Sequence, residues 1–138
     1  MREGFQTFDH TGDLGLDVWA ETPVRLFELA AEAVLAQVAE APGAVEVSVA
    51  LELDGDDPAD LFVHWLNTAL LEAEVRRAIW TRATVHGLTE NTLFATLAGP
   101  RLDAARHTRL REVKAVSHHD LDLVLNPTEC RCRLVLDL

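Results

Sequence analysis

The clearest fold signal in the chain is the stretch Val45-Glu46-Val47-Ser48-Val49-Ala50-Leu51-Glu52-Leu53-Asp54-Gly55-Asp56-Asp57-Pro58. Apolar residues alternate without a break from Val45 to Leu53, and a period of two is typical of a strand. Asp54-Gly55-Asp56 then predicts a turn. Asp57 is a favourable helix N-cap and Pro58 suits the first helical position. We therefore expect a strand, a turn and a helix in direct succession.

Two helices are expected, one on each side of this strand. Thr22 and Pro23 begin the first helix, which we expect to stop near Pro42-Gly43. The second helix begins at Pro58. Apolar residues recur at helical spacing in both: Leu26, Phe27, Ala30, Ala33, Val34 and Val38 in the first, and Leu61, Phe62, Trp65, Leu66, Ala69 and Leu70 in the second.

The remaining strands lie mostly in the second half of the chain. Strands are expected at 14–20, at 79–86 and 92–98 as a hairpin around 87–91, and at 110–117, 121–125 and 130–138. The expected order is β(β)αβαβββββ. Early helices and late strands predict an α+β fold, with a largely antiparallel β-sheet packed against two main helices. A strand-helix-strand pattern occurs twice, at 14–53 and 53–86, which suggests a duplicated unit.

Length and charge restrict the classes of function. A chain of 138 residues is most simply one domain, spanning 1–138. No apolar run approaches the roughly 20 residues of a membrane span, and the N-terminus lacks a signal peptide. We expect a cytoplasmic protein without a membrane partner. A formal net charge of −11 repels phosphate backbones, so we expect no tight direct binding of nucleic acid.

The densest group of polar side chains is Asp9-His10-Thr11-Gly12-Asp13. Gly12 allows a tight turn, and Asp9 and Asp13 are spaced so that one bend would aim both carboxylates at one point. Oxygen-rich sites suit magnesium, calcium or manganese. The structural alternative is a turn in which one aspartate caps backbone amides.

Lys114 is the only lysine in the chain, beside eleven arginines. An ammonium is a compact point charge, whereas a guanidinium is a planar fork, so the exception indicates a site that needs an ammonium. One retained surface lysine is the structural alternative. The chain has no Gly-rich phosphate loop, nucleophile elbow or metalloprotease helix motif. A binding or accessory role is therefore favoured over catalysis.

The late segments contain a second group of metal-binding residue types. His118, His119, Cys130 and Cys132 would together supply zinc ligands. Their spacing is not that of a known zinc site. We instead expect Cys130 and Cys132 to fill one face of a strand. Trp19, Trp65 and Trp80 are expected to be core or interface anchors.

Five segments resemble the archease family, and the resemblance runs along nearly the whole chain. They are Phe8-Asp9-His10-Thr11-Gly12-Asp13-Leu14-Gly15, residues 26–31, residues 61–67, Glu112-Val113-Lys114-Ala115-Val116-Ser117-His118-His119, and residues 135–138. The first and fourth are the most specific. The family usually has Ala at the position of Gly12, and Tyr or Trp near His118. These departures change no functional group.

The resemblance implies a small cytosolic α+β protein that is not itself an enzyme. Archeases assist the RtcB-type RNA ligase, which seals RNA ends after tRNA splicing or RNA damage with GTP and manganese. They promote formation of the guanylylated ligase and allow repeated turnover.

The resemblance also implies site residues. The divalent-cation site of the family falls on Asp13, Asp137 and Leu138, the last through its backbone or terminal carboxylate. Asp9 and His10 match the same motif and would lie nearby. Lys114 matches a lysine that the family requires for function. We expect calcium as the ion, with magnesium and manganese as alternatives.

Two other functions stay open. A general chaperone or protein-modulating adaptor would need a sizeable exposed apolar patch. A small metal-dependent phosphohydrolase would use Asp9 and Asp13, with His10 as its base.

Overall fold

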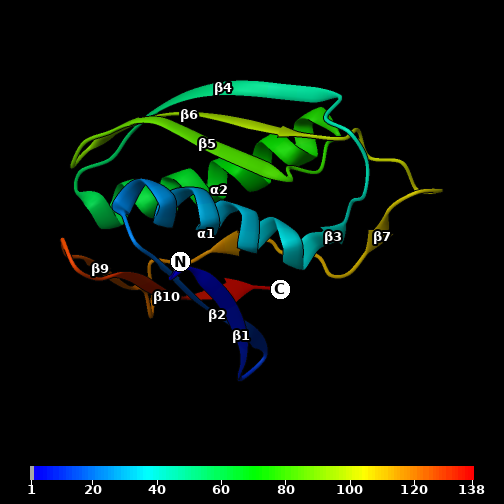
Figure 1. The fold of residues 1–138 in the computed structure, drawn as a ribbon. Helices are drawn as coiled ribbons and strands as arrows, with labels where there is room; N and C mark the ends of the chain where they lie inside the picture. Colours follow the sequence, from blue (N-terminus) through cyan, green and yellow to red (C-terminus); the bar gives the residue numbers. More distant parts are fainter. Residues whose placement is uncertain (1) are drawn as a thin grey trace.

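The computed structural model describes residues 2–138, which form three layers with two helices between two antiparallel sheets (Figure 1). One sheet contains β1 (Gly4–His10), β2 (Asp13–Ala20), β10 (Cys130–Asp137), β8 (Ala115–Val116) and β9 (Asp122–Leu125). Its order is β1-β2-β10-β8, and β9 also pairs with β10. The other sheet has the order β4-β6-β5, with β4 at Val47–Asp54, β6 at Thr92–Gly99 and β5 at Arg82–Leu88.

Both helices begin where the capping residues predicted. In α1 (Pro23–Val38), the Thr22 hydroxyl accepts a hydrogen bond from the Arg25 N–H at 3.1 Å. In α2 (Pro58–Arg76), the Asp57 carboxylate accepts one from the Asp60 N–H at 2.8 Å. The first helix ends earlier than expected, because the chain leaves Val38 as the short strand β3 (Ala39–Glu40), which pairs with β7 (Thr108–Arg109).

The centre of the helix layer is aromatic. The rings of Phe27 and Phe62 meet edge to face, with centroids 4.9 Å apart. The indole N–H of Trp65 donates to the Phe27 carbonyl at 2.8 Å, and that of Trp80 donates to the Ala69 carbonyl at 3.1 Å. These bonds satisfy the polar ends of buried rings. Trp65 and Trp80 are therefore core anchors, as predicted, whereas Trp19 stays partly exposed.

The α+β class is confirmed, and the structure adds that the strands form two principal sheets instead of one. The two strand-helix-strand units differ in topology. In the first, β2 and β4 belong to different sheets, whereas in the second β4 and β5 lie in one sheet on either side of β6.

The late part of the chain is less regular than its sequence indicated. Of the strand expected at 110–117, only β8 forms. The preceding residues contact the helix layer instead, since the Leu110 N–H donates to the Val38 carbonyl at 2.9 Å. The strand expected from Ile79 begins at Arg82, because Ile79 bonds to Pro100 outside the regular ladder.

Within residues 2–138, neither helix is both long enough and apolar enough to cross a membrane.

Candidate functional site

The polar motif near the N-terminus forms the hairpin between β1 and β2. His10 and Asp13 are paired directly across it, so Thr11 and Gly12 make a two-residue turn. Gly12 has φ of 75°, a conformation that glycine adopts without strain. The tight turn of this hairpin therefore relies on Gly12, the residue that the sequence indicated for it.

The register separates the two aspartates of this motif. Asp9 is opposite Leu14, whereas Asp13 is opposite His10. Paired residues share a face and successive residues alternate, so Asp9 and Asp13 point to opposite faces of the hairpin. The expectation that one bend aims both carboxylates at one point is therefore wrong. The same register argues against a phosphohydrolase that uses Asp9 and Asp13 together.

The C-terminal strand supplies Asp13 with a different neighbour. Leu136 of β10 is opposite Leu14 of β2. The next residue on each strand, Asp137 and Asp13, therefore falls on the other face, and both are half-buried. His10, Asp13 and Asp137 thus form a row across three neighbouring strands. We refer to Asp13, Asp137 and Leu138 as the acidic tip.

The acidic tip has a donor set that fits a hard cation. The described part of the chain gives neither the Asp13 nor the Asp137 carboxylate a hydrogen bond or ion pair. Two half-buried like charges on adjacent strands repel each other, and a bound cation would relieve this repulsion. Carboxylate and main-chain oxygens are ligands that calcium prefers, with water completing the shell. Among residues 2–138, no group of three or more His, Cys, Asp or Glu side chains surrounds one point, so main-chain oxygens would have to contribute.

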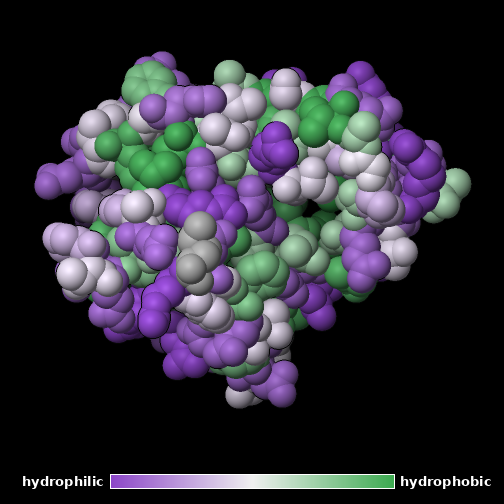
Figure 2. Space-filling view, viewed as in Figure 1, coloured by the Kyte–Doolittle hydropathy of each residue, from purple (hydrophilic) through white to green (hydrophobic). Residues whose placement is uncertain are grey.

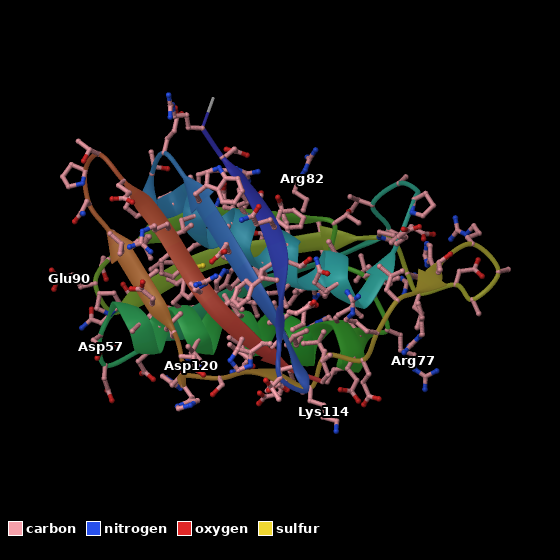
Figure 3. The ribbon with its side chains drawn as sticks, turned by 90° about the horizontal axis from the view of Figure 1, so that it is seen from below. Asp57, Arg77, Arg82, Glu90, Lys114 and Asp120 are labelled. Carbon is pink, nitrogen blue, oxygen red and sulfur yellow. The ribbon has the colours of Figure 1, made fainter. Side chains whose placement is uncertain are left out.

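Lys114 lies directly beside the acidic tip. Its backbone N–H donates to the Asp137 carbonyl at 2.8 Å. The side chain is exposed, and Figure 3 shows it near the end of the β1–β2 hairpin. It also lines a groove between the two helices. The main chain of Lys114 is thus fixed at Asp137, while its ammonium is open to a partner.

Asn67 of α2 holds this part of the chain in place. Its side-chain amide donates to the Val116 carbonyl at 2.9 Å and accepts from the Val116 N–H at 2.7 Å. These two bonds fasten β8 to the helix layer two residues after Lys114. Sequence reasoning assigned Asn67 no role, although an amide beside an apolar stripe was a detectable signal.

Asp120 is a further residue that sequence reasoning missed. Its carboxylate lies 3.8 Å from the His10 ring and 3.4 Å from the His119 ring. A left-handed backbone at Asp120, with φ of 63°, turns the chain back toward β9. The segment after β8 therefore adds another acid beside the β1–β2 hairpin.

The zinc alternative is not assembled. Cys130 and Cys132 are buried on the core side of β10, and His118 bonds to Asp60 at 3.2 Å instead. The pKa of the Asp60 carboxyl lies below its ordinary value. The main cause is the hydrogen bond that it accepts from the Asp56 N–H, and the second is its hydrogen bond with His118. As predicted, the two cysteines fill one face of a strand.

Comparison with known proteins gives one consistent answer. The model of the archease protein family (MTH1598/TM1083) matches residues 5–138. The chain belongs to the archease family. Protein archease of Sulfolobus acidocaldarius is 27% identical over 137 residues, covering 97% of this chain and 98% of that protein. Protein archease of Methanopyrus kandleri is 26% identical over 138 residues, with 97% and 99% covered.

A solved structure has the same fold as this archease-family chain. The solution structure of Methanobacterium thermoautotrophicum protein 1598 superposes with a TM-score of 0.79 at 23% identity, covering 98% of this chain and 99% of that one. The archease resemblance is therefore confirmed. Two segments that carried it, 61–67 and 112–119, meet in space through Asn67 and Val116.

Proposed function

We propose that this archease-family chain is an accessory factor that activates an RtcB-type RNA ligase by promoting its guanylylation and repeated turnover. Family membership over residues 5–138 supports the proposal. The structural observation that carries it is the juxtaposition of Asp13 and Asp137 on neighbouring strands, although 124 positions separate them in the sequence (137 minus 13). The chain itself acts as an activator and not as an enzyme.

The acidic tip would hold one divalent cation. The carboxylates of Asp13 and Asp137 and an oxygen of Leu138 are its protein ligands in this proposal, and calcium, magnesium and manganese all accept such donors. Once bound, the ion would supply a positive charge that attracts a phosphate or carboxylate of the ligase. His10 flanks Asp13 in the same row, and Asp9 lies on the opposite face of the hairpin.

Lys114 would present a second positive charge to the ligase. Its main chain is fixed by Asp137, and β8 is fixed by Asn67, so the base of the side chain is well positioned. No carboxylate among the described residues forms an ion pair with its ammonium. An unpaired ammonium retains its full charge for a phosphate or carboxylate of the partner.

The test is multiple-turnover RNA ligation by the RtcB-type ligase of the same organism, with GTP and manganese. Addition of the wild-type protein should raise turnover and the fraction of guanylylated ligase. Asp13→Asn keeps the size of the side chain but removes its charge, and we expect at least about a tenfold loss of stimulation. Lys114→Ala should also abolish most of the stimulation, because the ammonium is lost.

Glu90→Ala is the matched control for charge. Glu90 is exposed in the turn between β5 and β6, well away from Lys114 in Figure 3. The Glu90→Ala variant should stimulate ligation like the wild type. Thermal unfolding should show that all variants are folded. Full stimulation by folded Asp13→Asn would refute the role of the acidic tip. Absence of stimulation by the wild type would refute the proposed function.

A further inference from the structure

A groove of about 940 Å³ runs between the C-terminal ends of the two helices and the segment that precedes β8. Leu35 and Val38 of α1, Leu70 of α2 and Val113 contribute apolar surface to it. Figure 2 shows the surface hollowed beside the C-terminal half of α1, the part of this helix that lines the groove. Lys114 also lines the groove and bonds to Asp137 through its backbone, so the groove reaches the acidic tip.

The groove gathers positive charge in a strongly acidic protein. Four cations line it, namely Arg77, Arg109, Arg111 and Lys114, against two acids, Glu74 and Glu112. The chain as a whole has a net charge of −11 and only 12 lysine and arginine residues. A third of its cations therefore surround one groove, giving it a local sign opposite to that of the molecule.

These four cations have no acidic partner within the described chain. Most other arginines do: ion pairs are formed by Arg25, Arg76, Arg106, Arg131 and Arg133. Unpaired arginines that converge on an apolar groove provide forked donors for carboxylates. The four cations of the groove thus outnumber its two acids, and none of the four forms an ion pair within residues 2–138.

One of the three arginines is held in position. The Arg111 guanidinium donates to the side-chain oxygen of Gln37 at 2.8 Å, and Gln37 itself is buried and donates to the Ala33 carbonyl. Among residues 2–138 the guanidinium of Arg111 has no other hydrogen-bond partner, so its remaining N–H groups are available to a ligand. Arg111 is therefore oriented before any ligand binds, which lowers the entropic cost of binding.

The apolar surface indicates which kind of anion fits. Every apolar residue that lines the groove is aliphatic, so it lacks the aromatic face on which a base would stack. On α2, Leu71 at the rim and Val75 one turn later are 58% and 66% exposed. Exposed aliphatic side chains beside unpaired arginines suit a chain segment that carries both carboxylates and leucine-like side chains.

We infer that this groove docks an acidic, aliphatic segment of a partner protein. The inference rests on the proposed function for the partner's identity, an RtcB-type ligase, because the groove adjoins the acidic tip at Lys114. The groove supplies affinity and orientation, and the acidic tip supplies activation. The arginines of the groove are thus docking residues and lie outside the activating set.

The experiment measures binding and stimulation separately. Arg77→Gln/Arg109→Gln removes two unpaired charges, and Arg82→Gln is the control, since Arg82 is exposed on β5 and lies on the far side from Arg77 and Lys114 in Figure 3. Equilibrium binding of each folded protein to the ligase is measured at low and high salt. We expect the double variant to bind about tenfold more weakly, with a smaller salt dependence, and the control to bind like the wild type.

Stimulation at saturating concentration then separates docking from activation. The double variant should reach the turnover of the wild type, because its acidic tip is intact, whereas Asp13→Asn should not. If the wild type stimulates but the double variant binds as tightly, the groove is not the docking site and the proposed function still holds. If the wild type neither binds nor stimulates, the proposed function fails, and the assignment of the groove to the ligase fails with it.

Discussion

At the scale of single residues, the two cysteines show how burial controls chemistry. Removal from water raises the pKa of the Cys132 thiol to about 12 and also raises that of Cys130. Because the thiolate is the reactive species, we predict that neither thiol of the native protein reacts with a disulfide reagent near pH 8. Both should react after denaturation, and rapid labelling of the native protein would contradict this.

The same burial makes the free energy of unfolding depend on pH. It should fall as the pH rises above about 9, because the thiols of the unfolded chain ionise there and the buried thiols do not.

At the scale of elements, α1 is fastened to the free edge of β5 by two carboxylates. The Val85 N–H donates to Glu28 at 2.8 Å, and the Ala83 N–H donates to Glu32 at 3.0 Å. Arg25 forms ion pairs with both glutamates and so holds them together. The edge of β5 is thereby covered, which prevents it from pairing with another chain.

Removal of one of these carboxylates should destabilise the fold. Glu28→Ala leaves the Val85 N–H without its partner and Arg25 with fewer acids, so we predict a loss of about 1–3 kcal/mol in the free energy of unfolding. Glu21→Ala, at an exposed position just before α1, should change it by less than about 0.5 kcal/mol. Urea denaturation compares the two variants, and equal midpoints would contradict the prediction.

At the scale of the whole molecule, the acidic tip joins the first hairpin to the last strand. A cation bound there by Asp13 and Asp137 would stabilise only the folded state, because the unfolded chain does not bring these residues together. We predict that calcium raises the melting temperature of the wild type. At a calcium concentration about one hundred times the dissociation constant, the free energy of unfolding should rise by about 2.7 kcal/mol. A chelator should reverse the effect, and Asp13→Asn should lack it. An equal shift in Asp13→Asn would place the ion elsewhere.

Much of the helix layer was predictable because its signals are local. Thr22 and Asp57 cap their helices through hydrogen bonds to residues three positions later. Trp65 lies on an apolar stripe that has the helical period. The segment 110–117 was predicted less well. Its apolar residues suited a strand, but Leu110 bonds to α1, and only Ala115 and Val116 pair with β10. Which partner a backbone finds is a tertiary event that no local pattern encodes.

The candidate site divides in the same way. Four features could be predicted from the sequence, because each depends on residue identity and short spacing. They are the family, the α+β class, the turn at Gly12 and the presence of a single lysine, Lys114. Three features of the site required the tertiary structure. They are the separation of Asp9 from Asp13, the juxtaposition of Asp13 and Asp137, and the grouping of unpaired arginines in one groove. Strand register sets the first two, since a shift of one residue exchanges the faces of a strand. Packing of distant segments sets the third, because Arg77, Arg109 and Arg111 line one groove only once the helix ends and the segment before β8 have come together.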